Sequence, residues 1–423
     1  MTAKIVITGM GVISPYGIGP DILWDNLMKG ESGLKPLTSF DTSHIQCRVG
    51  GQLLDFNPQP YLPPRLTRKI DRFSTFGLVA THLALQNGGL LVDGKEPVWS
   101  QQEQGGNRVG ITVGNNLGGW EFAERELRHL WQQGPRDVSP YMATAWFPAA
   151  VQGNVSVHFG IKGVGRTFLS DRASGALAMM HAADCLQRGR ADVMVAGGTE
   201  APFSPYAALC YETSGLMSRQ AVTGSTSAYR PFDREHDGLV TGEGAAFFIL
   251  ERAEDAERRG AVVLAELAGW AATNDGYDLV RAAPDGKRSA AAMMRAMQQA
   301  GVGAEEIDCI FAAGSAVPDE DVSETRAIHL ALGDTATHVP VSTPKSAFGN
   351  LFGAALPVDT AIALLAMQQR MIPATLHLDQ PAQECDLDYV PRTPRRVERI
   401  DHCLLNARGI GGANASMLLR RWS

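Results

Sequence analysis

Short apolar runs alternate with longer segments of helical periodicity along the chain, which predicts alternating strands and helices. Residues 108–113 and 191–198 are predicted strands, and the Ala- and Leu-rich segment 174–188 between them is a predicted helix. Such alternation is typical of parallel sheets whose faces are covered by helices. The sequence therefore predicts an α/β fold.

The same order of predicted elements occurs a second time in the C-terminal part. The strand predicted at 262–269 repeats the strand that opens the chain at residue 4, and the strand predicted at 307–315 repeats the strand at 108–113. Residues 340–345 and the helix predicted at 354–369 repeat a strand, turn and helix that surround residue 172. This repetition predicts two similar halves.

The two halves are expected to meet near residues 254–260, where the sequence has no Pro- or Ser-rich linker. We therefore predict an N-terminal half, residues 1–255, and a C-terminal half, residues 256–423, that form one rigid body.

Composition narrows the functional classes. With 423 residues, 44% of them apolar, the chain is long enough to bury a large core. A net charge of −7 argues against a nucleic-acid partner. The six cysteines show no metal-ligand spacing, which predicts free thiols and no metal site. We expect a cytoplasmic protein, because the sequence shows no signal peptide and no apolar run long enough for a membrane span.

The segment 163–180 is predicted to form a strand, a sharp turn and a helix, which is the geometry of a nucleophile elbow. The start of the helix would stabilise a thiolate or an oxyanion there. The residue at the tip is Arg172, whose guanidinium stays protonated and cannot attack a carbonyl. The scaffold for covalent catalysis is thus predicted without its nucleophile.

A buried guanidinium needs a carboxylate within hydrogen-bond reach, because an unpaired buried charge is unfavourable. The candidates are Asp171, Glu200, Asp321 and Glu324. Arg172 then either plugs a disused active site or reflects drift after catalysis was lost, and both interpretations predict no chemistry at this position.

Other nucleophiles are poor candidates. Ser170 and Ser174 flank the tip, but a serine needs an adjacent base. Cys185 lies further along the predicted helix, where a core position is expected.

A second informative helix is expected after Gly118 and Gly119. One apolar stripe recurs at i, i+3, i+7 and i+10, and consists of Trp120, Ala123, Leu127 and Leu130. The opposite face is predicted to carry two i,i+4 ion pairs, Glu121 with Arg125 and Glu124 with Arg128. Periodicity alone favours an ordinary amphipathic helix that buries its stripe in the core.

The whole chain resembles the condensing enzymes of fatty-acid and polyketide synthesis, the β-ketoacyl-acyl-carrier-protein synthases. Four motifs in family order carry the resemblance, at residues 4–15, 230–244, 344–350 and 409–414. The resemblance implies a thiolase-like fold, with two similar α/β halves in αβαβα layers.

In that family the active site is one Cys and two His. The matching positions in this sequence are Arg172, before the segment Ala-Ser-Gly, and Ala313 and Asn350 in the two later motifs. Lys345 and Glu324 match the supporting Lys and Glu of the family and are kept. The resemblance therefore implies that no residue of the catalytic triad remains.

An intact frame with a substituted Cys resembles the chain length factor, or ketosynthase β subunit, of type II polyketide synthases. Members usually carry Gln at the elbow, so Arg172 is a departure. The segments 118–131, 138–141 and 145–147 look most like chain length factors of aromatic polyketide systems. In these factors the helix after Gly119 lies at the heterodimer interface and lines the end of the polyketide tunnel.

This resemblance implies a non-catalytic subunit that forms an obligate heterodimer with a ketosynthase α subunit. It implies no cofactor in this chain, and the phosphopantetheine is that of the partner acyl carrier protein. The positions that match the tunnel-gating residues are Trp120, Ala123 and Leu127. The alternatives are an independent malonyl decarboxylase or acyltransferase, a module that only binds carrier proteins, and a ketosynthase partner of an aryl-polyene system.

Overall fold

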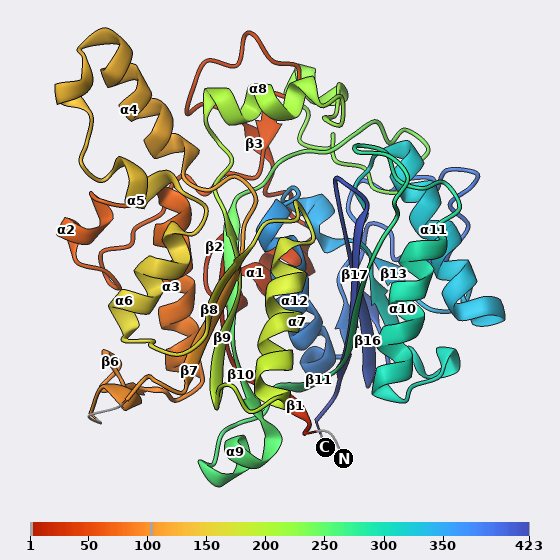
Figure 1. Cartoon of the computed structure of the whole chain (residues 1–423). Coiled ribbons are helices and arrows are strands. Elements are labelled where there is room, and N and C mark those ends of the chain that lie inside the picture. Colours follow the sequence, from red (N-terminus) through yellow and green to blue (C-terminus); the bar gives the residue numbers. More distant parts are fainter. Residues whose placement is uncertain (1–2, 102–104, 423) are drawn as a thin grey trace.

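A computed structural model of the chain describes residues 3–101 and 105–422 (Figure 1). The predicted elements of the N-terminal half are present as strands β7 (Val109–Gly114) and β9 (Val193–Glu200) and the helix α7 (Ser174–Gln187) between them. The predicted helix of the C-terminal half is α12 (Ala355–Gln369). The α/β fold predicted from the alternation of strands and helices is confirmed.

The strands of the N-terminal half form one sheet. Their order is β1 (Ile5–Ser14), β10 (Gly244–Arg252), β9, β7 and β8 (Gly165–Phe168). The first two neighbouring pairs are antiparallel, and the last two are parallel.

The C-terminal half repeats this arrangement strand for strand. Its order is β11 (Ala265–Asn274), β17 (Ala413–Arg420), β16 (His402–Gly409), β12 (Cys309–Phe311) and β13 (Val341–Ser342). Two antiparallel pairs are again followed by two parallel pairs. The duplication predicted from the sequence is therefore confirmed, and β1 joins the two halves by a short pairing with β11.

Helices separate and cover the two halves of the sheet (Figure 1). The helices α3 (Arg72–Asn87) and α6 (Ala150–Phe159) cover the outer face of the first half. The outer face of the second half is covered by α10 (Lys287–Ala300) and α11 (Pro318–Leu332), and α7 and α12 lie between the halves. The αβαβα layers of a thiolase-like fold are thus confirmed.

The central layer explains why α7 and α12 are apolar on nearly all sides. Every residue of α12 from Ala355 to Met367 is buried, because sheets and helices surround it. None of the helices that the structure describes is long and apolar enough to cross a membrane.

The strand predicted at 307–315 is shorter than expected, since β12 ends at Phe311. Residues 313–316 leave the sheet and donate their N–H groups to carboxylates of α11. The division predicted between residues 255 and 256 lies within the short helix α9 (Ala253–Arg258).

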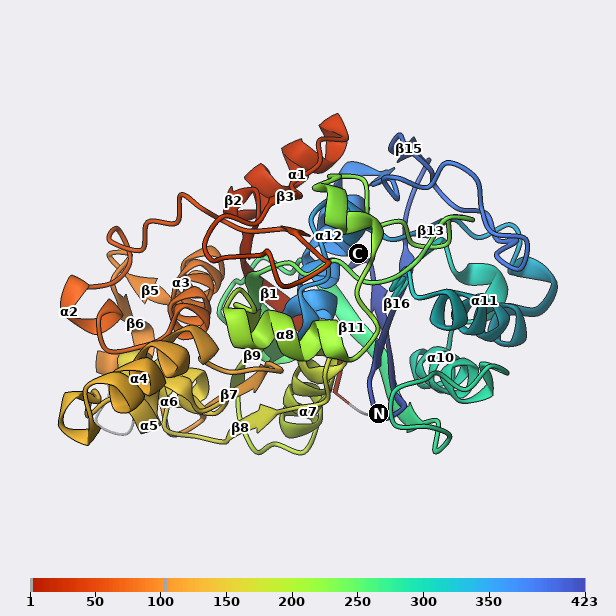
Figure 2. The same cartoon turned by 90° about the horizontal axis from the view of Figure 1, so that it is seen from above.

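Further helices project beyond the ends of β7 and β9 (Figures 1 and 2). These are α4 (Trp120–Gln132), α5 (Met142–Trp146) and α8 (Pro205–Thr213). The remaining elements are α1 (Pro20–Lys29), α2 (Pro64–Thr67) and the short strands β2 (Gly17–Ile18), β3 (Lys35–Pro36), β4 (Val49–Gly50), β5 (Leu91–Val92), β6 (Glu96–Pro97), β14 (Met371–Ile372) and β15 (Arg395–Arg396).

Candidate functional site

The turn between β8 and α7 has the predicted elbow geometry. Asp171 has a φ of 50°, in the left-handed region that few residues other than glycine adopt. The Ser174 hydroxyl donates to the Asp171 carbonyl at 2.6 Å and accepts from the Ser170 N–H at 2.7 Å. These bonds hold the turn and place Arg172 at its tip.

Arg172 is 4% exposed and is neutralised by two carboxylates. Its Nη1 and Nη2 atoms donate to the two carboxylate oxygens of Glu320 at 2.7 and 2.9 Å, which is a bidentate pair. Its Nε atom donates to Asp171 Oδ2 at 3.1 Å. The prediction that a carboxylate pairs with Arg172 is confirmed for Asp171, whereas the stronger partner, Glu320, was not predicted.

The charges of this pair stabilise each other against burial. Burial lowers the pKa of Arg172, but Glu320 and Asp171 together raise it above the ordinary value. Burial would raise the pKa of Glu320, but the neighbouring Arg172 holds it below the ordinary value. Both groups are therefore ionised at neutral pH.

The other three predicted carboxylates bind backbone N–H groups instead, so their assignment to Arg172 was wrong. Glu324 accepts from Ala313 and Gly314 at 2.9 Å each, and Asp321 accepts from Ser315 at 3.0 Å. Glu200 accepts from the N–H groups of Asn116, Leu117 and Gly353. The sequence did hold a signal for Glu320, because it lies one helical turn before Glu324 on α11 and thus on the same face.

The three positions that match the family's catalytic triad come together in the fold. Arg172, Ala313 and Asn350 line one cavity with Lys345, and this cavity holds only about 10 Å³. A single water needs at least roughly that space, so no acyl group fits beside the Arg172 side chain.

The supporting residues of this site are also in place. Lys345 Nζ donates to the Ala312 carbonyl at 2.8 Å and forms an ion pair with Asp359 Oδ2 at 2.6 Å. Asn350 Oδ1 accepts from the Phe352 N–H at 2.9 Å. Asn350 is thereby committed to the backbone of the following turn.

Ser174 and Cys185, two of the alternative nucleophiles, are not activated by the described residues around them. The Ser174 hydroxyl donates to a backbone carbonyl, as described above, and not to a base. Cys185 is 1% exposed and belongs to the apolar core, as predicted. Its Sγ lies 3.5 Å from His181 Nε2, but burial raises the pKa of the thiol, which disfavours the thiolate.

The helix predicted after Gly119 is α4, and its buried face differs from the predicted stripe. Phe122, Ala123 and Glu126 are buried, whereas Trp120 and Leu127 are only partly buried. Of the predicted gating residues, Ala123 therefore packs inside this chain, while Trp120 and Leu127 face the groove described next.

Neither predicted i,i+4 ion pair forms on α4, all of which the structure describes. Arg125 Nε instead donates to Glu126 at 3.0 Å. Glu124 Oε1 accepts from Ser204 Oγ and from the Tyr206 N–H at 2.6 Å each. Glu124 was predicted to stabilise the helix through an ion pair, but in the structure it holds the start of α8 against α4.

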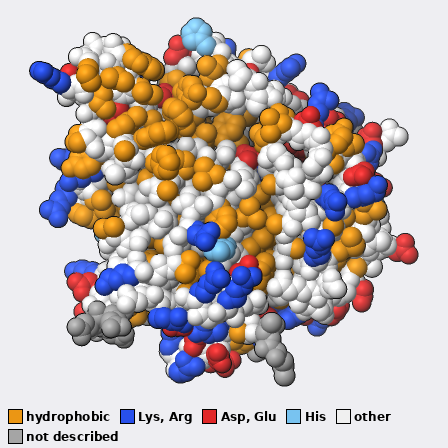
Figure 3. All heavy atoms as spheres, viewed as in Figure 1, with side chains coloured by type: hydrophobic (Ala, Val, Ile, Leu, Met, Phe, Trp, Pro, Cys, Tyr) orange, Lys and Arg blue, Asp and Glu red, His pale blue; other side chains and the backbone are white. Residues whose placement is uncertain are grey.

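Trp120 and Leu127 line an apolar groove of about 650 Å³ between α4 and α8. The Trp120 ring packs against Tyr206 at 4.5 Å and against Trp146 at 5.8 Å between centroids. Trp131, at the end of α4, is 77% exposed. Figure 3 shows hydrophobic side chains gathered over this region, and surfaces of this kind mark interaction sites.

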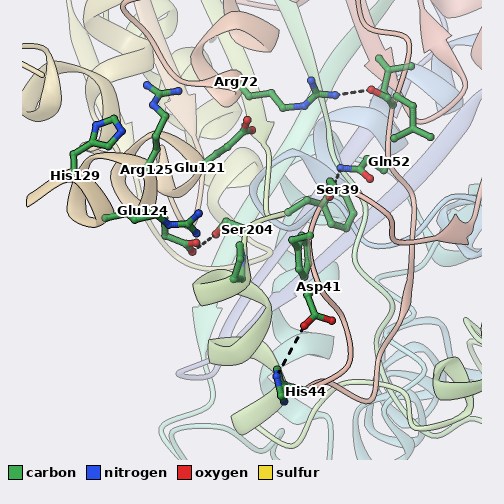
Figure 4. Close-up of a pocket in the computed structure, with 16 residues that line it drawn as sticks. Ser39, Asp41, His44, Gln52, Arg72, Glu121, Glu124, Arg125, His129 and Ser204 are labelled. Atoms are coloured by element: carbon green, nitrogen blue, oxygen red, sulfur yellow. Dashed lines mark hydrogen bonds and ion pairs between the residues drawn. The ribbon is translucent and has the colours of Figure 1, made fainter. Parts of the chain in front are cut away.

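An adjoining face of α4 borders a polar groove of about 770 Å³ (Figure 4). Glu121, Arg125 and Arg72 point into it, and Arg72 is held by a bidentate pair with Glu243 at 2.7 and 2.9 Å. Glu124 borders both grooves. The helix α4 thus separates the two grooves, with an apolar face toward one and a polar face toward the other.

The buried carboxylate of Asp71 holds the start of α4 in place. Asp71 Oδ1 accepts from the Phe73 N–H at 3.0 Å, and its Oδ2 accepts from the Phe122 N–H at 2.7 Å. The same side chain therefore caps α3 and holds the first turn of α4. Burial raises the pKa of Asp71 to about 7, although hydrogen bonds from Phe122 and Phe73 lower it.

This arrangement predicts a pH-dependent effect of Asp71→Asn. A carboxyl with a raised pKa in the folded state gives stability at low pH that is lost as the pH rises through about 7. Asn does not titrate, so the free energy of unfolding of the wild type should fall by about 1–2 kcal/mol relative to that of the variant between pH 5.5 and 8. One titrating group can change this free energy by at most about 1.4 kcal/mol per pH unit. Urea unfolding at both pH values measures this, with the exposed Glu96→Gln as control. A stability difference that stays constant with pH would contradict it.

Comparison with known proteins covers the whole chain. Residues 2–256 match the family described as "Beta-ketoacyl synthase, N-terminal domain", and residues 264–379 match "Beta-ketoacyl synthase, C-terminal domain". The chain is 34% identical over 419 residues to the 3-oxoacyl-[acyl-carrier-protein] synthase 2 of Vibrio cholerae, covering 99% of each protein. It is 33% identical to the corresponding synthase of Staphylococcus aureus, covering 99% of this chain and 98% of that protein.

Three solved structures are similar over 100% of both chains with a TM-score of 0.89. One, 26% identical, is described as "AntDE:AntF (apo): type II PKS acyl-carrier protein in complex with its ketosynthase bound to the hexaketide". Another, also 26% identical, is "The ishigamide ketosynthase/chain length factor". The third, 28% identical, is a β-ketoacyl synthase from Burkholderia phymatum.

Proposed function

Because the chain belongs to the β-ketoacyl synthase family, we propose that it is a non-catalytic chain length factor of a type II polyketide synthase. In this proposal it pairs with a catalytic ketosynthase and shapes the tunnel in which a poly-β-ketone is extended on an acyl carrier protein. Aromatic polyketide synthesis is favoured, and a cytoplasmic location is part of the proposal.

The observation that carries the proposal is the buried ion pair of Arg172 at the elbow. The guanidinium occupies the tip from which a nucleophile would act, and two carboxylates hold it there. Ala313 and Asn350 offer no imidazole to bind a thioester oxygen or a malonyl carboxylate. In this proposal the site keeps the family's backbone architecture but performs no condensation.

The bidentate geometry supports a plug rather than drift as the role of Arg172. A tolerated replacement would not need a matched pair of buried carboxylates, whereas Glu320 and Asp171 together accept from all three nitrogens of the guanidinium. We propose that Arg172 closes the disused site and holds α7 against α11.

The exposed apolar groove between α4 and α8 supports the proposal that a partner subunit binds there. Trp131, on the wall of this groove, is 77% exposed, and Phe147, which packs against Trp146, is 55% exposed. We propose that a ketosynthase subunit covers them in an obligate heterodimer of roughly 2,000 Å² or more. The acyl carrier protein would bring the phosphopantetheine, and no cofactor is assigned to this chain.

Reconstitution tests the proposal. A ketosynthase that retains its Cys and two His, mixed with this chain and malonyl carrier protein, should form polyketide, whereas each subunit alone should not. Arg172→Cys in the isolated chain should not restore synthesis, because Ala313 and Asn350 remain. Ketide formation by the isolated chain, or a stable and fully active ketosynthase without it, would overturn the proposal.

A further inference from the structure

Two cysteines that are distant in sequence meet inside the C-terminal half. The Sγ atoms of Cys309 and Cys403 lie 3.1 Å apart, although the residues are 94 positions apart along the chain. All six cysteines lie in the part of the chain that the structure describes, and each of them is a free thiol there. Among these six, only Cys309 and Cys403 are in contact with each other.

The sheet places the two thiols side by side. Cys309 lies on β12 and Cys403 on β16, and these strands are parallel with the two cysteines directly opposite each other. Neighbouring strands of a sheet are about 4.8 Å apart, and a disulfide joins Cα atoms about 4.4–6.8 Å apart. The backbone spacing therefore already suits a disulfide, and only the two sulfur atoms need to move closer.

Both thiols point toward the central helical layer. Side chains alternate between the faces of a strand, so Cys309 shares its face of β12 with Phe311. Cys403 likewise shares its face of β16 with Leu405. These four side chains belong to one apolar cluster with residues of α12. Both cysteines are 0% exposed, so a reagent in solution does not reach them in the closed fold.

Hydrogen bonds hold this strand pair in register at both ends. At its start, Asp308 Oδ2 accepts from the N–H groups of Asp401 at 2.6 Å and His402 at 2.9 Å. At its end, Glu324 Oε1 accepts from Asn406 Nδ2 at 3.3 Å, and the same carboxylate binds the segment that follows β12. The register cannot slip while these bonds persist, so the two thiols stay opposite each other.

The pair is unreactive until the strands separate. Burial raises the pKa of the Cys403 thiol well above its ordinary value, and the contact with Cys309 raises it further. The thiolate is the attacking species in thiol–disulfide exchange, so the closed fold disfavours the reaction. β12 is only three residues long and lies next to the last strand of the sheet, so few hydrogen bonds must break to open it.

We infer that Cys309 and Cys403 are a redox-sensitive pair that a low-molecular-weight disulfide, such as oxidised glutathione, converts into a cross-strand disulfide. In the first exchange, one cysteine sulfur bonds to a glutathione sulfur, the glutathione S–S bond breaks, and one reduced glutathione leaves. In the second exchange, the other cysteine sulfur displaces the remaining glutathione. The two cysteines are oxidised, one oxidised glutathione is reduced, and the two thiol protons end on two glutathione thiols.

The disulfide would act as a staple between β12 and β16. It would close a loop of more than ninety residues, which restricts the unfolded chain and thereby stabilises the fold. It would also fasten the strand from which residues 313–316 leave the sheet. Neither thiol lines the cavity beside Arg172, so the pair responds to oxidation whether or not the chain is catalytic.

Peptide mapping after oxidation tests the pair. The exposed Cys210 is first replaced by Ser in every protein, so that glutathione bound there does not contribute. The Cys210→Ser protein is incubated with excess oxidised glutathione, both at room temperature and just below its Tm. The reaction is stopped with acid, free thiols are alkylated, and peptides are identified by mass spectrometry without reduction. A second sample is used to measure the Tm before and after oxidation.

We expect a linked peptide that contains Cys309 and Cys403, formed faster at the higher temperature because the strands must open first. We also expect the Tm to rise by at least about 3 °C and to return on reduction with dithiothreitol. Cys309→Ser and Cys403→Ser, each in the same background, should abolish both effects. The control is Cys385→Ser, which removes a cysteine that is 1% exposed and should leave both effects unchanged.

The absence of the linked peptide after incubation just below the Tm would overturn the inference. So would a linked protein whose Tm is unchanged or lower, or a rise in Tm that persists in either serine variant. Peptide mapping of the protein that keeps both cysteines needs neither variant, so a serine variant that fails to fold does not leave the question open.

Discussion

Glu320→Ala is expected to lower the free energy of unfolding by about 3–5 kcal/mol, because it leaves the buried Arg172 with Asp171 alone. Glu320 supplies two of the three short hydrogen bonds to the guanidinium, at 2.7 and 2.9 Å. Urea unfolding of wild type and variant measures the loss.

The double replacement R172M/E320L separates the pair from simple loss of packing. It removes both charges of the bidentate pair and keeps similar volume, and Asp171 keeps its hydrogen bonds from Asn116 Nδ2 and the Ile410 N–H, so it should be less destabilising than Glu320→Ala alone. Arg258→Ala is the control, since its ion pair with Asp255 is at the surface and should contribute less than about 1 kcal/mol. A loss below about 1 kcal/mol for Glu320→Ala would show that Arg172 is not locked in the site.

Trp120→Ala is expected to shift the products of the heterodimer toward chains longer by one or more two-carbon units. Trp120 is one of two tryptophans on the wall of the apolar groove, and its ring packs against both Tyr206 and Trp146. A tunnel that ends against a packed ring excludes a longer chain at about 1–3 kcal/mol for a misfit of a few methylenes. Each 1.4 kcal/mol changes the competition between extension and release about tenfold.

Leu127→Trp fills the same groove and should shift the products toward shorter chains. Tyr277→Ala is the control, because it removes an aromatic ring that is 61% exposed in the C-terminal half. Product lengths are compared by mass spectrometry of the reconstituted pair. Unchanged lengths for both groove variants, with normal assembly and condensation, would show that α4 does not set chain length.

Much of the fold was predictable because its buried strands and helices appear as apolar runs along the sequence. The apolar helices α7 and α12 and the strands β7 and β9 lie close to their predicted limits, since uniform burial in a layered fold leaves long apolar runs. The strand predicted at 307–315 was too long, because carboxylates of α11 draw residues 313–316 out of the sheet. Such a long-range competition leaves no local pattern.

The site was predictable only in part. The tip position of Arg172 followed from a local turn, but its main partner, Glu320, lies 148 residues away. The predicted stripe on α4 shares only Ala123 with the buried face, which also contains Glu126, whose carboxylate accepts the Ser139 N–H at 2.7 Å. Periodicity assigns burial to apolar residues, so it does not detect a buried carboxylate that serves a loop.

The role of α8 was missed entirely. Tyr206 and Leu209 complete the apolar groove, and they come from a helix with little amphipathic pattern. Their contribution depends on the hydrogen bond from Ser204 to Glu124, which joins two helices distant in sequence.

The central claim is that this chain forms no acyl-enzyme, and the intact mass of the protein tests it most directly. The purified chain and a ketosynthase with an intact Cys are each incubated with acyl and malonyl carrier protein and then weighed by mass spectrometry. We predict an acyl adduct on the ketosynthase and an unchanged mass for this chain, because Arg172 occupies the nucleophile position. A covalent acyl adduct on this chain would contradict the account.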